Sequence, residues 1–146
     1  MADRWWPLVV GGFIPAVLYG LAGVFQKWSA RSGGTVSIYL IGFGAATFVV
    51  GWAFRWILAD PKATTGSLWF ALAGGAAFAL GAGLISLALI RFDAAIAQLS
   101  PLYNANVLIT VGLGLAIFAE SRNLDVGRLL LGTVLVIAGA FFVSNA

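Results

Sequence analysis

The chain has 146 residues, of which 62% are hydrophobic and only 9% are charged. Soluble domains carry about 25% charged residues, so a soluble domain of this length could not hide so much apolar surface, and the composition predicts a membrane protein. The net charge of +3 comes from eight Lys and Arg residues that are scattered between apolar segments, which excludes the clustered basic surface of a nucleic-acid-binding protein. Because cysteine and histidine are both absent, we expect no disulfide, no thiolate site, no metal site and no cofactor.

The first apolar segment covers about residues 7–25 and has tryptophans on both sides, which predicts an aromatic belt at each membrane interface. It runs past any small-residue cleavage site, so we do not expect a cleaved signal peptide. Pro15 removes one backbone donor, and we expect a kink there. Two interpretations of its polar face stay open. The face is either a packing seam in which Tyr19 hydrogen-bonds to a neighbour, or one wall of a cavity.

The second apolar segment covers about residues 36–58 and follows a turn in which Gly33 and Gly34 supply backbone freedom. A row of small residues shares one face of this segment with Tyr39. Arg55 near its end is interpreted as an interfacial anchor whose long side chain reaches toward the lipid headgroups.

A ladder of small residues follows one face of the third segment, about residues 68–90. Its members are Ala71, Gly75, Ala79, Gly83 and Ser86. Such a ladder lets two helix backbones approach closely, so we predict a helix–helix contact, which against another chain would be an oligomer interface. Only residues 91–93 separate this segment from the next. The two segments are therefore predicted to be antiparallel neighbours, and Arg91 could pair with Asp93 at the surface.

The fourth segment, about residues 94–118, is long enough to cross a bilayer, yet its first half is unusually polar and contains Pro101. At about 100° per residue, five of its polar side chains fall within a sector of roughly 160°. They are Ser100, Tyr103, Asn104, Asn106 and Thr110. A polar stripe on a helix that crosses lipid is unfavourable unless it faces protein or water. We therefore predict that this stripe forms one wall of a cavity, with Tyr103, Asn106 and Thr110 in line.

The fifth segment covers about residues 126–143 and carries Gly132 and Gly139 on one face. Five spans place the two termini on opposite sides of the membrane. The N-terminus and the connections on its side carry five Lys or Arg residues, against three on the other side. This bias leans toward a cytoplasmic N-terminus, but it also suits a chain that inserts in both orientations.

Several features of the last three segments occur together in one known family of membrane proteins. They are Leu87, Ala88 and Leu89 at the end of the third segment, Pro101 early in the fourth, Glu120 at its end, and Gly132 and Gly139 in the fifth. In this order and spacing they resemble the second part of an EamA-like domain of the drug/metabolite transporter superfamily. The resemblance covers residues 1–146 as a single five-helix unit. It implies an all-α polytopic protein of the bacterial cytoplasmic (inner) membrane, which forms half of a ten-helix inverted-repeat transporter.

One departure from related proteins bears on the substrate. The small multidrug resistance exporters carry a membrane-embedded glutamate in their first helix, whereas no Asp or Glu lies within any apolar segment here. This argues against proton or cation antiport driven by a carboxylate, and it favours a neutral or zwitterionic substrate. Glu120 is interpreted as a structural residue that caps a helix end or pairs with Arg122 or Arg128.

The resemblance and the polar stripe together predict a small-solute transporter, an exporter of a neutral or zwitterionic metabolite that works as a dimer by alternating access. The partner is expected to be a second copy, which an inverted arrangement would make into ten helices, or a sister five-helix chain. The residues expected to line the cavity are Tyr103, Asn106, Thr110, Asn104, Ser100, Tyr19, Tyr39 and Ser86.

Two alternatives are a non-transporting scaffold or accessory subunit of a larger complex, and a partner in a lipid-linked-sugar flippase. An enzyme is not expected, because the sequence offers no nucleophile–base pair, no metal cluster and no phosphate-binding loop.

Overall fold

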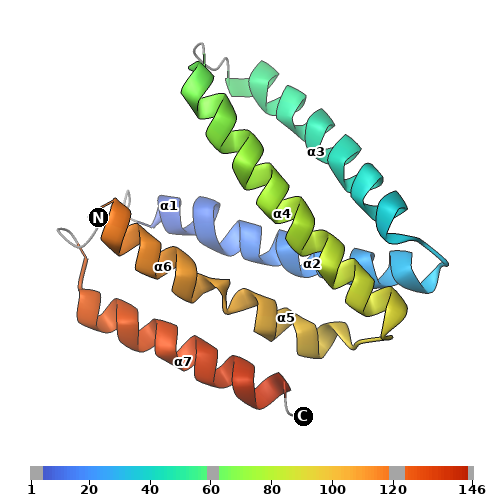
Figure 1. The fold of residues 1–146 in the computed structure, drawn as a ribbon. Helices are drawn as coiled ribbons and strands as arrows, with labels where there is room; N and C mark the ends of the chain where they lie inside the picture. Colours follow the sequence, from blue (N-terminus) through green and yellow to red (C-terminus); the bar gives the residue numbers. More distant parts are fainter. Residues whose placement is uncertain (1–4, 59–62, 119–123, 145–146) are drawn as a thin grey trace. The chain divides into compact units, whose positions relative to one another are not determined.

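All regular structure in the described part of the chain is helical (Figure 1). The computed structural model describes residues 5–58, 63–118 and 124–144. Five helical stretches are long and apolar enough to cross a membrane, as the sequence predicts for an integral membrane protein. They are Trp6–Arg31, Val36–Leu58, Thr65–Arg91, Ile96–Ile117 and Val126–Val143.

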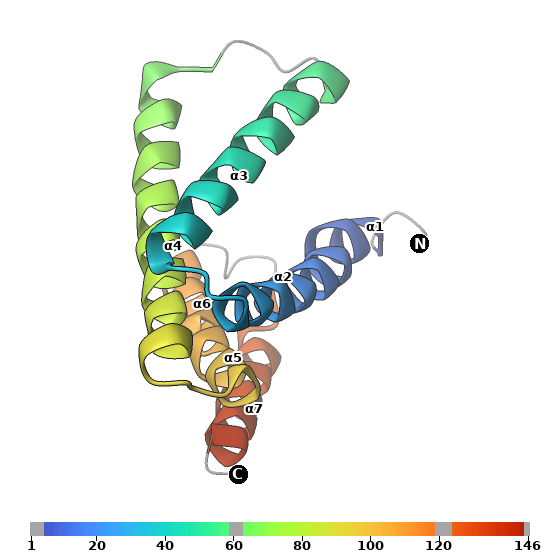
Figure 2. The same ribbon diagram turned by 90° about the vertical axis from the view of Figure 1, so that its right-hand side faces the viewer.

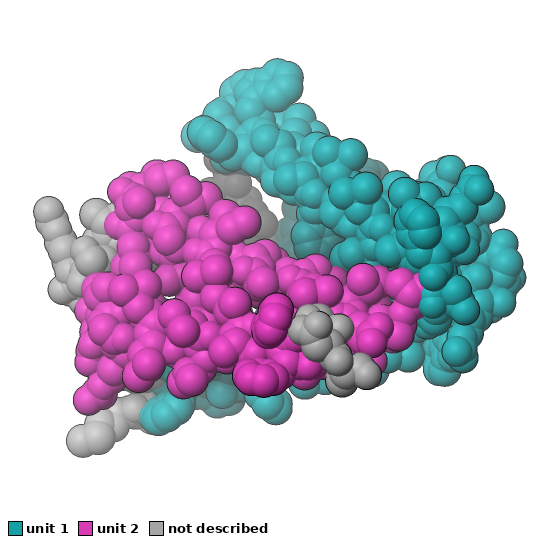
Figure 3. All heavy atoms as spheres, turned by 60° about the horizontal axis from the view of Figure 1, so that its bottom comes forward, with its two compact units in different colours: residues 1–93 teal, residues 94–146 magenta. Residues whose placement is uncertain are grey.

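The chain divides into two compact units, Met1–Asp93 and Ala94–Ala146 (Figure 3). The first contains α1 (Trp6–Leu8), η2 (Val9–Phe13), α2 (Ile14–Arg31), α3 (Val36–Leu58) and α4 (Thr65–Arg91). The second contains α5 (Ile96–Asn104), α6 (Asn106–Ile117) and α7 (Val126–Ser144). The expected antiparallel pairing of the third and fourth segments crosses the boundary between the units, and it stays a prediction.

The first span is interrupted by a π-helical turn immediately before Pro15. In this turn, η2, the amide of Ile14 bonds to the carbonyl of Val9, five residues back. A proline lacks an N–H, and its ring crowds the preceding turn. The wider π-helical turn makes room for the ring of Pro15 while the chain remains helical. The hydrogen-bond ladder is therefore altered where the sequence predicts a kink.

The first span ends at Arg31 rather than near residue 25, because the stop signal lies further along the chain. Gly33 has a φ of 81°, the left-handed conformation that closes many helices. Its amide bonds to the carbonyl of Ala30 at 3.3 Å, and the amide of Gly34 bonds to the carbonyl of Ser29 at 2.9 Å. These two bonds form a Schellman motif, so the predicted glycine turn is confirmed.

Helix α4 begins at Thr65, earlier than the predicted residue 68, because Thr64 caps it. The Thr64 hydroxyl accepts a hydrogen bond from the amide of Ser67 at 3.2 Å. Figure 2 shows α3 and α4 closest near the start of α3 and further apart at the opposite end. The closeness depends on Gly83, where an added Cβ would lie 3.3 Å from a methyl of Leu40.

Within this unit, only the C-terminal end of the small-residue ladder of α4 packs against other helices. Gly83 contacts α3 and Ser86 is buried, whereas Ala71 is exposed and an added Cβ on Gly75 would have no neighbour within 4 Å. The predicted helix–helix contact is thus confirmed for the C-terminal part of the ladder. The oligomer interface stays a prediction.

In the second unit, α7 packs against α5 (Figure 1). The inward face of α7 buries Thr133 and Ala140, and the Thr133 hydroxyl donates to the carbonyl of Leu129 at 2.8 Å. Gly132 and Gly139 are both exposed, and an added Cβ on either would have no neighbour within 4 Å. The face that these two glycines share is therefore not a packing face inside this unit.

The geometry of the turn after α2 predicts that alanine substitutions of its two glycines destabilise the protein, whereas the same substitution at a glycine inside the helix does not. Gly33→Ala should lower the free energy of unfolding by about 1–2 kcal/mol, because a Cβ is unfavourable in the left-handed conformation. Gly34→Ala should be similarly harmful, because its Cβ would lie 2.6 Å from the carbonyl oxygen of Ser29. Denaturant titration of the purified protein in micelles, followed by circular dichroism, measures both changes.

Gly20→Ala is the matched control for these variants. Gly20 lies inside α2, and an added Cβ there would meet nothing within 4 Å. Alanine is the better helix former by about 0.5–1 kcal/mol, so this variant should be at least as stable as the wild type. Equal losses at all three positions would contradict the assigned turn geometry.

Candidate functional site

A buried hydrogen-bonded cluster joins α2 to α4. The side-chain amide of Gln26 donates to the hydroxyl of Ser86 at 2.8 Å and to the carbonyl of Ala82 at 3.0 Å. Gln26 and Ser86 are 6% and 2% exposed, so both polar groups are withdrawn from lipid and from water. Their mutual hydrogen bond satisfies groups that would otherwise be unpaired in an apolar environment.

An ion pair lies next to this cluster in sequence and also ties α2 to the end of α4. Lys27 Nζ is 3.1 Å from a carboxylate oxygen of Asp93. The Lys27 side chain is 14% exposed whereas that of Asp93 is 95% exposed, so the pair sits at the rim of the unit. The sequence suggested Arg91 as the partner of Asp93. In the structure the partner is Lys27, and Asp93 follows the end of α4 with a left-handed backbone at a φ of 46°.

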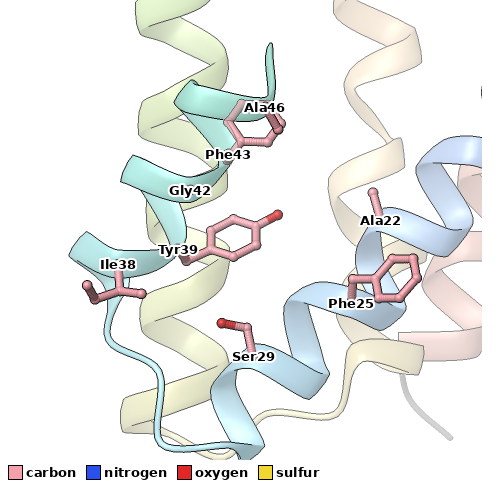
Figure 4. A pocket seen from close by; sticks show the side chains of 8 residues that line it. All are labelled: Ala22, Phe25, Ser29, Ile38, Tyr39, Gly42, Phe43 and Ala46. Carbon is pink, nitrogen blue, oxygen red and sulfur yellow. The ribbon is translucent and has the colours of Figure 1, made fainter. Parts of the chain in front are cut away.

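A groove of about 430 Å³ opens between α2 and α3 (Figure 4). It is lined by Ala22, Phe25, Ser29, Ile38, Tyr39, Gly42, Phe43 and Ala46. The hydroxyl groups of Ser29 and Tyr39 both point into the space between the two helices. The Tyr39 ring stacks on Phe43 with centroids 6.3 Å apart, and Phe43 stacks on Phe78 of α4 at 5.7 Å.

The fourth span is broken in its middle, at Ala105. The amide of Ala105 bonds to the carbonyl of Leu102 at 3.1 Å, three residues back, and the amide of Leu108 bonds to the carbonyl of Ala105 at 3.1 Å. Helix α5 therefore ends at Asn104 and α6 begins at Asn106. The break follows Pro101 by about one helical turn, whereas the hydrogen bond that Pro101 cannot make would have gone to the carbonyl of Ala97, on the N-terminal side of the proline.

This break changes the predicted polar stripe. The stripe assumed one continuous helix, but Ser100, Tyr103 and Asn104 belong to α5 whereas Asn106 and Thr110 belong to α6. Ser100 and Tyr103 are half-buried, and the other three are exposed. The angular relation calculated at 100° per residue does not carry across Ala105, whose ψ of −9° departs from that of an α-helix. The predicted alignment of Tyr103 with Asn106 and Thr110 therefore holds only for an unbroken regular helix.

The remaining predicted cavity residues lie in the first unit and do not form one site there. Tyr19 is 66% exposed on α2, and Tyr39 lines the groove. Ser86 is enclosed in the contact with Gln26 rather than open to a cavity. Sequence reasoning missed Gln26 as the partner of Ser86. The available signal was an amide side chain near the end of a long apolar helix, which needs a partner in lipid.

The predicted pairing of Glu120 with Arg122 or Arg128 falls partly on residues 119–123, which lie outside the described residues. Arg128 lies within them, and its Nε is 3.0 Å from a carboxylate oxygen of Asp125. The other oxygen of this carboxylate accepts a hydrogen bond from the backbone amide of Arg128 at 3.1 Å, so Asp125 also caps the start of α7.

Comparison with known proteins gives no further assignment. The chain matches no protein-family model, no curated protein sequence and no solved structure. Among the described residues, no group of three or more acidic, histidine or cysteine side chains is arranged to hold a metal ion.

The buried cluster predicts a measurable coupling between Gln26 and Ser86. Hydrogen bonds between helices in membranes average about 0.6 kcal/mol, so Gln26→Leu should lower the free energy of unfolding by roughly 0.6–1.5 kcal/mol. The loss stays small because the Ser86 hydroxyl can turn to the carbonyl of Ala82, one helical turn before it. A double-mutant cycle with Ser86→Ala, measured by unfolding in mixed micelles, should show non-additivity of about 0.6 kcal/mol.

Gln98→Leu is the matched control, because Gln98 is an exposed glutamine on α5. It should change stability less than Gln26→Leu and should show no coupling to Ser86→Ala. Strict additivity of Gln26→Leu and Ser86→Ala would be incompatible with the hydrogen bond.

Proposed function

We propose that this protein is a small-solute membrane transporter, an exporter of a neutral or zwitterionic metabolite that works as a dimer. The observation that carries the proposal is the helix break at Ala105, near the midpoint of the Ile96–Ile117 span and flanked by Asn104 and Asn106. Substrate sites of secondary transporters are commonly built from discontinuous helices at mid-membrane depth.

The physical argument concerns the backbone as well as the side chains. Non-helical backbone at membrane depth is tolerated only where it is buried in protein or lines a water-filled cavity. The exposed Asn104 and Asn106 beside the break impose the same requirement, because an amide side chain facing lipid would be unpaired. A cavity at this level, completed by a second subunit, satisfies both requirements.

The polar groups around the break also support the substrate class. Helices α5 and α6 offer amides and hydroxyls, which donate and accept hydrogen bonds, and they carry no charged side chain. Such groups fit an uncharged or zwitterionic solute better than an ion with a single net charge.

Two irregular turns supply flexible points for alternating access. One is the π-helical turn before Pro15 and the other is the break at Ala105. Both replace regular α-helical hydrogen bonds with longer or shorter connections, so bending there disrupts fewer favourable interactions than in a regular helix.

One observation favours a second candidate, a scaffold or accessory subunit. Gln26 and Ser86 show that polar side chains of this chain form hydrogen bonds between helices. The polar residues of α5 and α6 could bind a partner helix in the same way. In that case their loss would disrupt assembly and not transport.

A flux measurement separates these two functions. Asn106→Ala should lower the initial rate of solute flux about fivefold or tenfold, as expected when one hydrogen bond to a bound solute is lost. The assay uses purified protein in liposomes and a panel of radiolabelled zwitterionic amino acids and neutral sugars. Ile109→Ala is the control, since this exposed apolar residue lies on the same helix.

Size-exclusion chromatography of the same preparations reports assembly. The transporter proposal requires that Asn106→Ala retain the wild-type oligomer while flux falls. If the wild type moves no member of the panel and the variant loses its oligomeric state, the scaffold is the correct function.

Orientation in the membrane tests the form of the dimer. A homodimer with inverted subunits requires that copies insert both ways, so reporters fused to the C-terminus should be active on both sides. Fluorescent-protein and alkaline-phosphatase fusions measure the cytoplasmic and external populations. Activity on one side only would rule out the inverted homodimer and leave a sister chain as the inverted partner.

A further inference from the structure

Both walls of the groove between α2 and α3 are fixed to α4. Gln26 holds α2 to α4 through Ser86 and the carbonyl of Ala82. Leu40 packs against Gly83, and Phe43 stacks on Phe78, which holds α3. The groove is therefore set by specific contacts on both sides and is not a chance separation of two mobile helices.

The groove runs along α2 and α3 from near the turn that joins the two helices. Its walls reach from the α2–α3 turn to Ala22 on one helix and to Ala46 on the other. At 1.5 Å per residue, these positions lie roughly 13–15 Å from the helix ends at Arg31 and Val36. That length along each helix axis is about half of a hydrocarbon core of about 30 Å.

The chemistry of the lining changes along this length. The hydroxyl groups of Ser29 and Tyr39 lie within about one turn of the helix ends, close to the turn that joins the two helices (Figure 4). Further in, the lining consists of aromatic rings and small residues, chiefly Phe43, Gly42 and Ala46. None of its described lining residues is charged.

We propose that this groove binds an uncharged amphiphile with a single acyl chain. Its hydroxyl- or ester-bearing head lies between Ser29 and Tyr39, and its chain lies along Phe25, Phe43 and Gly42. The volume of about 430 Å³ is within the range of about 300–1,000 Å³ that holds ligands of this size. We expect the molecule to enter sideways from the bilayer, because both walls of the groove belong to helices that are long and apolar enough to cross a membrane.

This inference does not depend on transport, because it concerns a site in the first unit and a ligand that partitions from the membrane. A cationic or anionic amphiphile fits less well, since no lining side chain would neutralise its charge. Lipid that merely surrounds the protein would contact all exposed helices alike, so selectivity for this groove is the property to be measured.

The test uses the full chain in lipid nanodiscs and a monoacylglycerol that carries a diazirine on its acyl chain. After illumination, mass spectrometry maps the cross-linked residues. Adducts should concentrate on α2 and α3 between Ala22 and Ala46, with far fewer on the exposed face of α7. Unlabelled monoacylglycerol should compete, whereas an alkyl trimethylammonium of equal chain length should not.

Two substitutions fill the groove from opposite walls. Gly42→Leu should reduce labelling several-fold. The new side chain can be accommodated, because no atom lies within 4 Å of a Cβ added to Gly42. Ala22→Leu should give a similar loss from the α2 side. Tyr39→Phe keeps the ring and removes the hydroxyl, and it should weaken binding less than either filling variant.

Gly44→Leu is the matched control, because Gly44 lies on another face of α3 and also has nothing within 4 Å of an added Cβ. It should label like the wild type. Equal labelling of α3 and α7, labelling that persists in both Gly42→Leu and Ala22→Leu, or equal competition by the cationic amphiphile would each overturn the proposal.

Discussion

In hydrocarbon, a polar group that lacks a partner inside the protein has none at all, and this constraint governs the architecture of the chain. Its clearest result is the hydrogen bond between Gln26 and Ser86. Few apolar side chains of the described residues are buried in the chain alone, with Leu89 and Ala140 as the core members. Helix association in the first unit therefore relies on this polar contact and on the close approach at Gly83, and not on a large hydrophobic core.

The same constraint applies to the helix break at Ala105, where backbone and side-chain polar groups also need hydrogen-bond partners. The side chain of Gln26 finds its hydrogen-bond partner within the described chain, so this contact serves to hold α2 against α4. At Ala105, the interrupted backbone and the neighbouring Asn104 and Asn106 need either water or other protein groups as hydrogen-bond partners. The first case fixes helices together, and the second supports the proposal of a transport pathway. The groove beside α2 differs from both, because its few hydroxyls lie near the ends of α2 and α3.

The number and approximate position of the spans could be predicted from sequence, because length and apolarity alone decide them. Helix ends were less predictable. The first span continued to Arg31 because Gly33 provides the stop, and α4 started early because Thr64 provides the cap. Both signals were present in the sequence, but hydropathy outweighed them in setting the boundaries.

The candidate site was predicted less completely, for two physical reasons. A helical wheel assumes a regular helix, so it could not show that the polar residues of the fourth span divide between α5 and α6. Periodicity also says nothing about which distant residue satisfies a polar group. Ser86 was therefore expected to line a cavity, whereas it is the buried partner of Gln26. The groove near Tyr39 depends on contacts between α3 and α4, and the sequence of either helix alone does not reveal these contacts.

The proposed transport function requires that the polar residues at the break in the fourth span face water rather than lipid. The chain contains no cysteine, so one introduced thiol is a unique probe. The most direct measurement compares Asn106→Cys with Ile109→Cys in liposomes, using a thiol reagent that is water-soluble and does not cross membranes. If the break lines an aqueous cavity, the thiol at position 106 reacts much faster than the thiol at position 109. If both thiols are equally protected from the reagent while the protein remains folded, the break does not line an aqueous cavity and the proposed transport pathway is wrong.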